Sequence, residues 1–191
     1  MEVPVFLVKR LIAPIAVLVG LMLGSTTAFA ASTTYEFRGN GAGTVQGSPT
    51  GCAFTLGSST TSCQSTGAFT AQAGPLPLVG TYVQAYTIAA NKAYVGTVPG
   101  EICAPATAST ALFTGAGNIY MKESGDACEF PPGSFGTGSE EEFEFIGNYS
   151  LTRGTGAFAG SSGNGLFVST VIETGITAGS DSITWAGTIK L

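Results

Sequence analysis

Two segments of the chain alternate between apolar and polar side chains. Residues 142–152 read EFEFIGNYSLT and residues 182–191 read SITWAGTIKL. In each segment large apolar side chains recur at every second position, which matches a β-strand with one buried face rather than a helix. The sequence after residue 30 is also rich in Thr, Ser, Gly, Phe and Tyr, a composition typical of strands and turns. These features predict an all-β fold.

The rest of the chain predicts more strands separated by turns that contain Gly, Ser or Pro. A total of about eight strands favours an antiparallel β-barrel, with a two-sheet β-sandwich as the alternative. Glycines inside the expected strands, such as Gly147 and Gly187, favour the barrel, since barrel corners need bends and close backbone approach. Residues 99–110 and 125–139 are expected to be irregular. The further strands are expected at residues 34–38, 51–56, 66–72, 79–89, 93–98, 111–122 and 163–173.

The first 30 residues have the pattern of an export signal. Lys9 and Arg10 precede an apolar run over residues 11–24, which is short for a membrane span, and Ala28-Phe29-Ala30 supplies a small-residue cleavage site. We expect cleavage near Ala30, a single domain over residues 31–191, and a secreted or periplasmic product with no stable membrane span. An uncleaved N-terminal anchor is the alternative.

Composition excludes several kinds of site. The chain has no His, so it cannot form a Ser-His-Asp triad or a His-ligated metal site. Its net charge is −5 and only 10% of its residues are charged, which argues against a nucleic-acid partner. We therefore expect no cofactor and no metal, and the residues do not indicate an oligomeric state.

The four cysteines predict two disulfides, because their number is even and the chain carries an export signal. Three pairings are possible. Loop length favours Cys52–Cys63 and Cys103–Cys128, each of which closes a short excursion of the chain. A metal site at these residues is not expected, because they include no C-x-x-C pair.

The last third of the chain resembles the allene oxide cyclase-like and dirigent-like β-barrels. Residues 149–170 read YSLTRGTGAFAGSSGNGLFVST, and the chain ends in TWAGTIKL. The resemblance implies a barrel of about eight strands whose interior can hold a small apolar molecule. It transfers no catalytic residue. The glycines suit a tight turn, and Phe158 is suited to close a barrel end. The residues that match the family's strand-turn-strand segment are Gly154, Thr155, Gly156, Phe158, Ala159, Gly160, Gly163 and Gly165.

Five side chains are candidates for binding a ligand. Glu142 and Glu144 belong to the acidic run over residues 140–144 and suit either a cation or a solvated strand face. Arg153 is suited to a carboxylate ligand, or to a strand end or a surface glutamate. Tyr82 and Tyr86 share one parity and are expected to line a pocket or to belong to the core.

These features predict an exported, disulfide-containing barrel that acts as a non-catalytic binding or structural module, with a small apolar molecule as its ligand. One alternative is a cyclase-like or isomerase-like enzyme that restrains a hydrophobic substrate inside the barrel, with carboxylates or tyrosines as its polar groups. The other is a component of the cell envelope or matrix that works through surface contacts.

Overall fold

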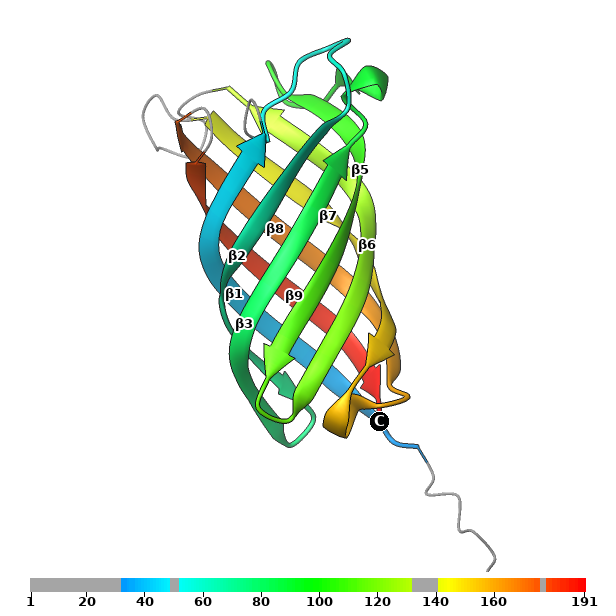
Figure 1. Cartoon of the computed structure of the whole chain (residues 1–191). Coiled ribbons are helices and arrows are strands. Elements are labelled where there is room, and N and C mark those ends of the chain that lie inside the picture. The colour runs from blue at the N-terminus through cyan, green and yellow to red at the C-terminus, as the bar shows by residue number, and fades with distance from the viewer. Residues whose placement is uncertain (1–31, 49–51, 132–140, 176–177) are drawn as a thin grey trace, which may run out of the picture. The chain divides into compact units, whose positions relative to one another are not determined.

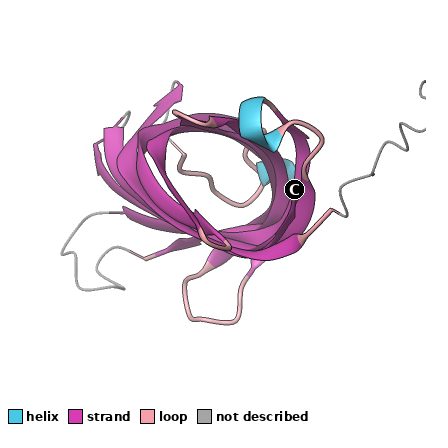
Figure 2. Ribbon diagram, turned by 90° about the horizontal axis from the view of Figure 1, so that it is seen from below, coloured by secondary structure: helices cyan, strands magenta, loops and turns pink. Residues whose placement is uncertain are grey.

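The structure, a computed structural model, is an antiparallel β-barrel (Figure 1). It describes residues 32–48, 52–131, 141–175 and 178–191, so the expected leader lies outside the described residues. Eight long strands follow one another around the wall, and β3 pairs with β5 to close the ring (Figure 2). These strands are β1 (Thr34–Ser48), β2 (Thr61–Ala73), β3 (Leu76–Ile88), β5 (Ile102–Thr114), β6 (Gly117–Phe130), β7 (Glu141–Gly154), β8 (Ser162–Gly175) and β9 (Ala178–Lys190).

Three short elements complete the described chain. The strand β4 (Tyr94–Val95) pairs with β5, and two single-turn 3-10 helices, η1 (Ala90–Lys92) and η2 (Gly156–Phe158), lie in connections. None of the described helices is long and apolar enough to cross a membrane. The expected barrel is confirmed, and the two-sheet sandwich is wrong because the β3–β5 pairing joins the two ends of the sheet.

The alternation in residues 142–152 and 182–191 sets the orientation of β7 and β9. Phe143, Phe145 and Tyr149 on β7 are buried, as are Ile183 and Trp185 on β9, and all five point into the barrel. Residues of the opposite parity, apart from those near the strand ends, are mostly exposed. The inward positions of all eight strands together form the filled interior, which we call the lumen.

Three expected segments differ from the structure. Residues 111–122 are not one strand, because Gly115 and Ala116 form the turn between β5 and β6. Most of residues 99–110 belongs to β5. Pro105 is tolerated there because its carbonyl still accepts the N–H of Ala89 at 2.9 Å, while the carbonyl of Ala89, the acceptor opposite the missing N–H, accepts from Lys92 at 2.8 Å.

The described part of residues 125–139 is also different from the expectation, since β6 extends through Phe130. Residues 52–56 are not a strand. Three of their backbone N–H groups donate to side chains instead of a neighbouring strand: Cys52 to Glu173 Oε1 at 2.6 Å, Phe54 to Glu129 Oε2 at 2.8 Å, and Thr55 to Ser58 Oγ at 3.2 Å. The strand expected at residues 93–98 shortens to β4.

The two ends of the barrel are built differently. At the lower end in Figure 1, which we call the base, short turns join β2 to β3 and β5 to β6, and η2 lies between β7 and β8. Phe158 of η2 is completely buried there, as its expected role at a barrel end requires. The other end, which we call the mouth, carries the segment at residues 52–60 together with η1 and β4.

Glycines on β1 make room for the largest side chains of the lumen. A Cβ at Gly41 would lie 2.9 Å from both Tyr82 Cε1 and Ile183 Cγ2, and a Cβ at Gly39 would lie 3.2 Å from Trp185 Cε3. The rings of Tyr82 and Trp185 meet edge to face with centroids 5.9 Å apart. The inward face of β1 therefore has to be flat for these rings to fit the lumen.

Candidate functional site

A group of hydrogen-bonded polar side chains crosses the middle of the lumen. Its first centre is Asp181 on β9, which is 3% exposed. Asp181 Oδ2 accepts hydrogen bonds from Ser65 Oγ and from the Tyr82 hydroxyl, the latter at 2.6 Å. Asp181 Oδ1 accepts from Ser169 Oγ at 2.7 Å. Three hydroxyl groups from β2, β3 and β8 thus converge on one buried carboxyl group.

The second centre is Glu123 on β6, which is 2% exposed. Glu123 Oε2 accepts from Gln84 Nε2 at 2.5 Å and from Thr110 Oγ1 at 2.7 Å, and its Oε1 accepts from Trp185 Nε1 at 3.1 Å. Tyr86 connects the two centres: its hydroxyl donates to Gln84 Oε1 at 2.5 Å and lies 3.0 Å from Ser169 Oγ. We call these nine residues the lumen network: Ser65, Tyr82, Gln84, Tyr86, Thr110, Glu123, Ser169, Asp181 and Trp185.

Burial dominates the electrostatics of the lumen. Desolvation raises the pKa of Glu123, and the charge of Asp181 adds to this, while the hydrogen bonds from Gln84, Thr110 and Trp185 oppose it. Desolvation and the charge of Asp181 also raise the pKa of Tyr86. Every Lys and Arg of the described chain is exposed, so none of them neutralises Glu123 or Asp181.

Tyr82 and Tyr86, the expected pocket residues, both point into the lumen as members of this network. Desolvation and Asp181 raise the pKa of Tyr82. Tyr149 on β7 also points inward, and desolvation raises its pKa to about 12. Its hydroxyl has no hydrogen-bond partner among the described residues. Large side chains occupy the space around these tyrosines; the fully buried ones are Trp185, Phe37, Phe145, Phe158, Phe167, Ile88, Leu112, Ile119 and Met121.

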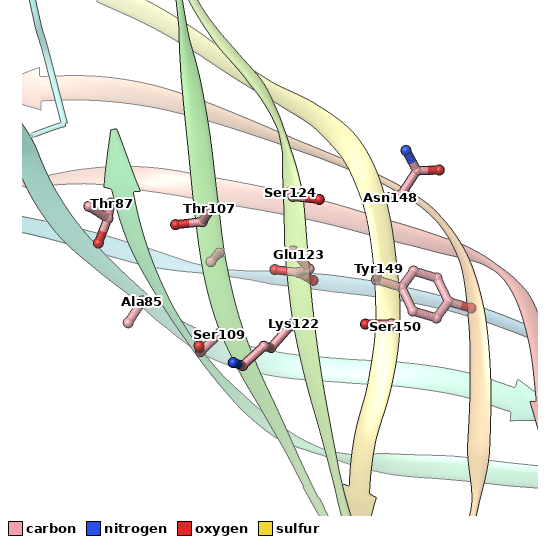
Figure 3. A pocket seen from close by; sticks show the side chains of 11 residues that line it. Ala85, Thr87, Thr107, Ser109, Lys122, Glu123, Ser124, Asn148, Tyr149 and Ser150 are labelled. Carbon is pink, nitrogen blue, oxygen red and sulfur yellow. The ribbon is translucent and has the colours of Figure 1, made fainter. Parts of the chain in front are cut away.

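A groove of about 560 Å³ lies on the outer wall, across β3, β5, β6 and β7 (Figure 3). Two rows of outward side chains line it, each made of cross-strand neighbours. The wall between the rows comes from the inward residues Ala108, Glu123 and Tyr149. One row consists of Thr87, Thr107, Ser124 and Asn148, and the other of Ala85, Ser109, Lys122 and Ser150.

A second groove of about 440 Å³ shares Ser109 and Lys122 with the first, so the two form one surface, which we call the wall groove. Arg153, the expected carboxylate-binding residue, lies in this second part. Its guanidinium carbon is 4.3 Å from the centre of the Tyr120 ring, a cation–π arrangement that orients the side chain over the wall. The structure thus places Arg153 near Lys122 on the outer wall, away from Tyr82 and Tyr86.

Glu142 and Glu144 lie on the outer parity of β7. The expected solvated face is wrong for Glu142, which is completely buried. Its cross-strand neighbours Phe130 and Ile172 bring large apolar side chains to the same row of the wall. Glu144 is half-buried, and desolvation followed by the charge of Glu101 raises its pKa. Neither glutamate lines the wall groove, and neither belongs to the lumen network. The rest of the acidic run, residues 140–141, has no described side chain.

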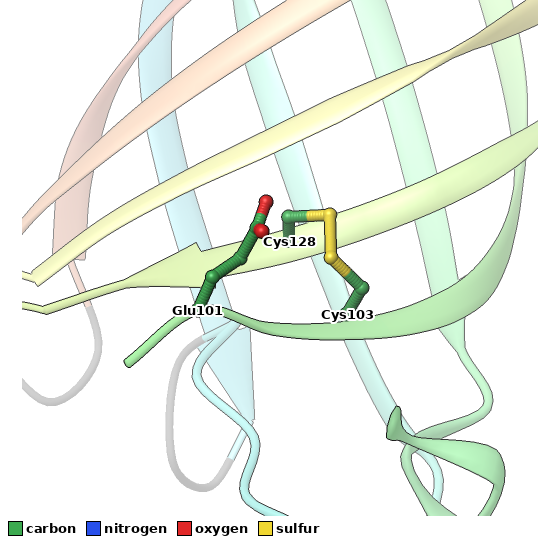
Figure 4. A group of neighbouring side chains, drawn as sticks. All are labelled: Glu101, Cys103 and Cys128. Atoms are coloured by element: carbon green, nitrogen blue, oxygen red, sulfur yellow. A yellow bond between two sulfur atoms is a disulfide. The ribbon is translucent and has the colours of Figure 1, made fainter. Parts of the chain in front are cut away.

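The cysteines form the two expected disulfides, Cys52–Cys63 and Cys103–Cys128. Glu101 lies beside the second one (Figure 4), and its carboxylate and the two sulfur atoms are within 4.8 Å of one another. This group does not suit a metal, because a disulfide has no thiolate to offer. Glu101 Oε2 instead accepts the N–H of Val98 at 2.9 Å. Glu101 therefore orders the connection before β5.

The glycines of the family-like segment take up the expected turn. Gly156 and Gly160 have φ angles of 59° and 78°, which require glycine, and they flank the buried Phe158. Gly154 ends β7, whereas Gly163 lies inside β8, where a Cβ would come 2.1 Å from the backbone oxygen of Thr188. The segment is a structural turn at the base and contributes nothing to the wall groove.

Sequence reasoning missed Glu123 and Asp181, the two acids of the lumen. Each lies on the same parity as neighbouring large apolar residues, Met121 in the first case and Ile183 in the second. An acidic residue on the apolar parity of a strand is the signal that identifies them. The wall groove gave no such signal, because its Ser, Thr and Asn residues look like any solvated strand face.

No family model, no curated protein and no solved structure matches the chain.

Proposed function

We propose that this protein is an exported, non-catalytic binding module whose rigid barrel presents the wall groove to a polar, acidic ligand. The observation that carries the proposal is the contrast between the two sides of the wall. Large aromatic side chains and the lumen network fill the inside, whereas both described grooves open on the outside. The resemblance to allene oxide cyclase-like barrels remains part of this proposal at the level of fold.

Two features support a location outside the cytosol. The leader at residues 1–30 predicts export, and both disulfides are of the kind that persists in an oxidising compartment. We expect the protein recovered from its producing cells to begin at Ala31 and to lie outside the cytoplasm. Cell fractionation followed by N-terminal sequencing tests both points. Recovery from the cytoplasm with the leader intact contradicts this part of the proposal.

The geometry favours the outer wall over the lumen as the ligand site. A cyclase-like or isomerase-like enzyme needs a cavity of about 300 Å³ or more beside its reactive groups. Glu123 and Tyr86 are such groups, but hydrogen bonds to other lumen residues already engage them, and aromatic rings surround them. At the mouth, the buried Phe54 packs edge to face on Phe143 with centroids 6.4 Å apart.

The chemistry of the wall groove indicates the ligand class. Its hydroxyl and amide side chains suit a ligand with many hydroxyl groups, because each can both donate and accept. Lys122 is shared by the two parts of the groove and Arg153 lies in the second, which suits carboxylate groups on the same ligand. Asp126, the next outward carboxylate along β6, lines neither part of the wall groove. We therefore infer an acidic saccharide as the ligand, a chemistry that fits the cell-envelope or matrix role.

Calorimetric titration with a hexamer of galacturonic acid tests this function, with maltohexaose as the uncharged comparison. We expect saturable binding of the acidic hexamer that weakens as salt is added. Lys122→Ala should weaken it by about tenfold, the effect of losing one charge-assisted hydrogen bond. Lys190→Ala is the matched control, because Lys190 is exposed on β9 and lies outside the groove. Equal loss in both variants, or no binding, contradicts the proposal.

Apolar fluorescent probes test the competing site inside the barrel. Trp185 is the only tryptophan of the chain, it is completely buried, and its indole is bonded to Glu123. A molecule that enters the lumen has to change its emission. We expect no saturable change with an apolar probe. A saturable change would move the ligand site into the barrel and favour the apolar-ligand or enzyme alternatives.

A further inference from the structure

The lumen network contains two buried carboxyl groups with no basic partner. Glu123 and Asp181 face inward from β6 and β9, and they accept hydrogen bonds from hydroxyl, amide and indole groups. Burying two negative charges in one apolar interior is unfavourable unless a cation or a proton neutralises one of them. Since all described Lys and Arg side chains are exposed, a proton is the available positive charge.

A single chain of hydrogen-bond contacts connects the two carboxyl groups. It runs from Asp181 Oδ1 to Ser169 Oγ at 2.7 Å, and from Ser169 Oγ to the Tyr86 hydroxyl at 3.0 Å. It continues from this hydroxyl to Gln84 Oε1 at 2.5 Å, and from Gln84 Nε2 to Glu123 Oε2 at 2.5 Å. The chain therefore has four contacts, and each contact needs one hydrogen.

Only three hydrogens are available when both carboxyl groups are ionised. Ser169 and Tyr86 have one hydroxyl hydrogen each, and the amide of Gln84 directs one N–H along the chain. If Ser169 donates to Asp181 and Tyr86 donates to Gln84, the contact between Ser169 and Tyr86 has no hydrogen. If the amide of Gln84 is turned over, the contact that lacks a hydrogen is instead the one between Gln84 Oε1 and Glu123 Oε2. One contact always places two oxygen atoms together without a hydrogen between them.

One added proton fills the gap from either end. If Asp181 carries it, Asp181 donates to Ser169, Ser169 to Tyr86, Tyr86 to Gln84 Oε1, and Gln84 Nε2 to Glu123. If Glu123 carries it, every donor direction reverses, with the amide of Gln84 turned over. A second added proton would leave one hydrogen without an acceptor in the chain. The hydrogen count of these four contacts is thus met by one added proton; Asp181 Oδ2 lies outside the count, in a separate group with Ser65 Oγ and the Tyr82 hydroxyl, which are 3.2 Å apart.

We propose that the lumen binds one proton, shared between Glu123 and Asp181 through Ser169, Tyr86 and Gln84, so that the two carboxyl groups together carry a single negative charge.

The surroundings of the network agree with this assignment. The ionisable side chains that face the lumen from the other described elements are Tyr82 on β3, Tyr149 on β7, Glu173 on β8 and the half-buried Tyr35 at the start of β1. Glu173 accepts the N–H of Cys52 near the mouth. The inward residues of β5 include no ionisable side chain, and Cys63 on β2 is in a disulfide. Burial raises the pKa of Glu123, which favours the protonated form.

Proton binding by the folded state makes the barrel more stable in acid than in alkali. A carboxyl group whose pKa is raised by folding stabilises the fold fully below its unfolded pKa, and this contribution is lost as the pH rises through the folded pKa. One extra bound proton changes the ratio of folded to unfolded protein by tenfold per pH unit. We expect this slope from about pH 5 upward, above the ordinary range of Glu and Asp.

Two isosteric substitutions test the hydrogen count. Glu123→Gln places an amide where the proton would sit at one end of the chain, and Asp181→Asn does so at the other. Each variant then has four hydrogens for four contacts and no proton to lose. Urea unfolding should show that each single variant is at least as stable as the wild type at pH 8 and lacks the tenfold slope. The double variant has five hydrogens for four contacts and should be less stable than either single variant.

The outcomes separate the shared proton from independent titration. If the effects of the two substitutions add in the double variant, the carboxyl groups do not share a proton and the proposal is overturned. Side-chain carboxyl ¹³C NMR of the wild type against pH decides the question without any variant. We expect one proton for the Glu123–Asp181 pair at pH 6. Signals that show both groups fully ionised, or both fully protonated, at that pH would refute the proposal.

Discussion

Tyr82 and Tyr149 of the lumen differ in the hydrogen bonding of their hydroxyl groups, and a Tyr→Phe substitution at each position measures this difference. The Tyr82 hydroxyl donates to Asp181 Oδ2 at 2.6 Å, whereas the Tyr149 hydroxyl has no hydrogen-bond partner among the described residues. Both side chains are almost completely buried. Replacement by Phe removes one oxygen atom in each case and keeps the ring. Comparison of Tyr82→Phe with Tyr149→Phe therefore isolates the contribution of the hydrogen bond.

The expected changes in the free energy of unfolding have opposite directions. Tyr82→Phe should destabilise the barrel by about 1.5–3 kcal/mol, the range for a hydrogen bond to a charged group. Tyr149→Phe should be neutral or stabilise by up to about 1 kcal/mol, because no hydrogen bond to a described residue offsets the loss of hydration of this buried hydroxyl. Urea unfolding with both disulfides intact measures the two values, and an unchanged m-value shows that the unfolded states are comparable. Equal losses in both variants would refute the reasoning.

Further predictions concern packing and covalent links. Gly41→Ala should cost about 1–3 kcal/mol, because its Cβ would overlap two buried side chains, whereas Gly115→Ala, with open space around it, should cost little. Phe158→Ala should cost about 3–5 kcal/mol, because it empties the base of the barrel. Replacing Cys52 and Cys63 by Ser should cost about 3 kcal/mol, since the loop they close is short. Thermal and urea unfolding measure all three. Except for the Gly115→Ala control, a variant with wild-type stability would contradict the prediction made for it.

The period-two segments made the barrel predictable, but only where the inward residues are large. The buried face is marked in the sequence by Phe143 and Phe145 on β7, and by Ile183, Trp185 and Ile189 on β9. On β5 the inward residues Ala104, Ala106 and Ala108 are small and alternate with Pro, Thr and Ser, so the strand has little contrast. The turn at Gly115 could not be predicted for a related reason, since strand-forming residues lie on both sides of it.

The lumen network was predictable only in part. Tyr82 and Tyr86 share a parity, and the structure places both in the lumen. Their partners come from strands far apart in the sequence, as Ser65 and Asp181 do, and pairing between such strands sets which side chains meet. The wall groove depends in the same way on the β3–β5 closure, which brings Thr87 beside Thr107. No local pattern encodes that register.

The measurement that tests the division between a filled lumen and a binding outer wall most directly is an NMR titration of the ¹⁵N-labelled protein with the galacturonic acid hexamer. The Trp185 indole N–H gives one unambiguous signal from the lumen, because the chain has a single tryptophan. We expect the amide signals of Lys122, Ser124 and Asn148 to shift in a saturable way while the indole signal stays in place. A shifting indole signal with unchanged groove amides would contradict the account.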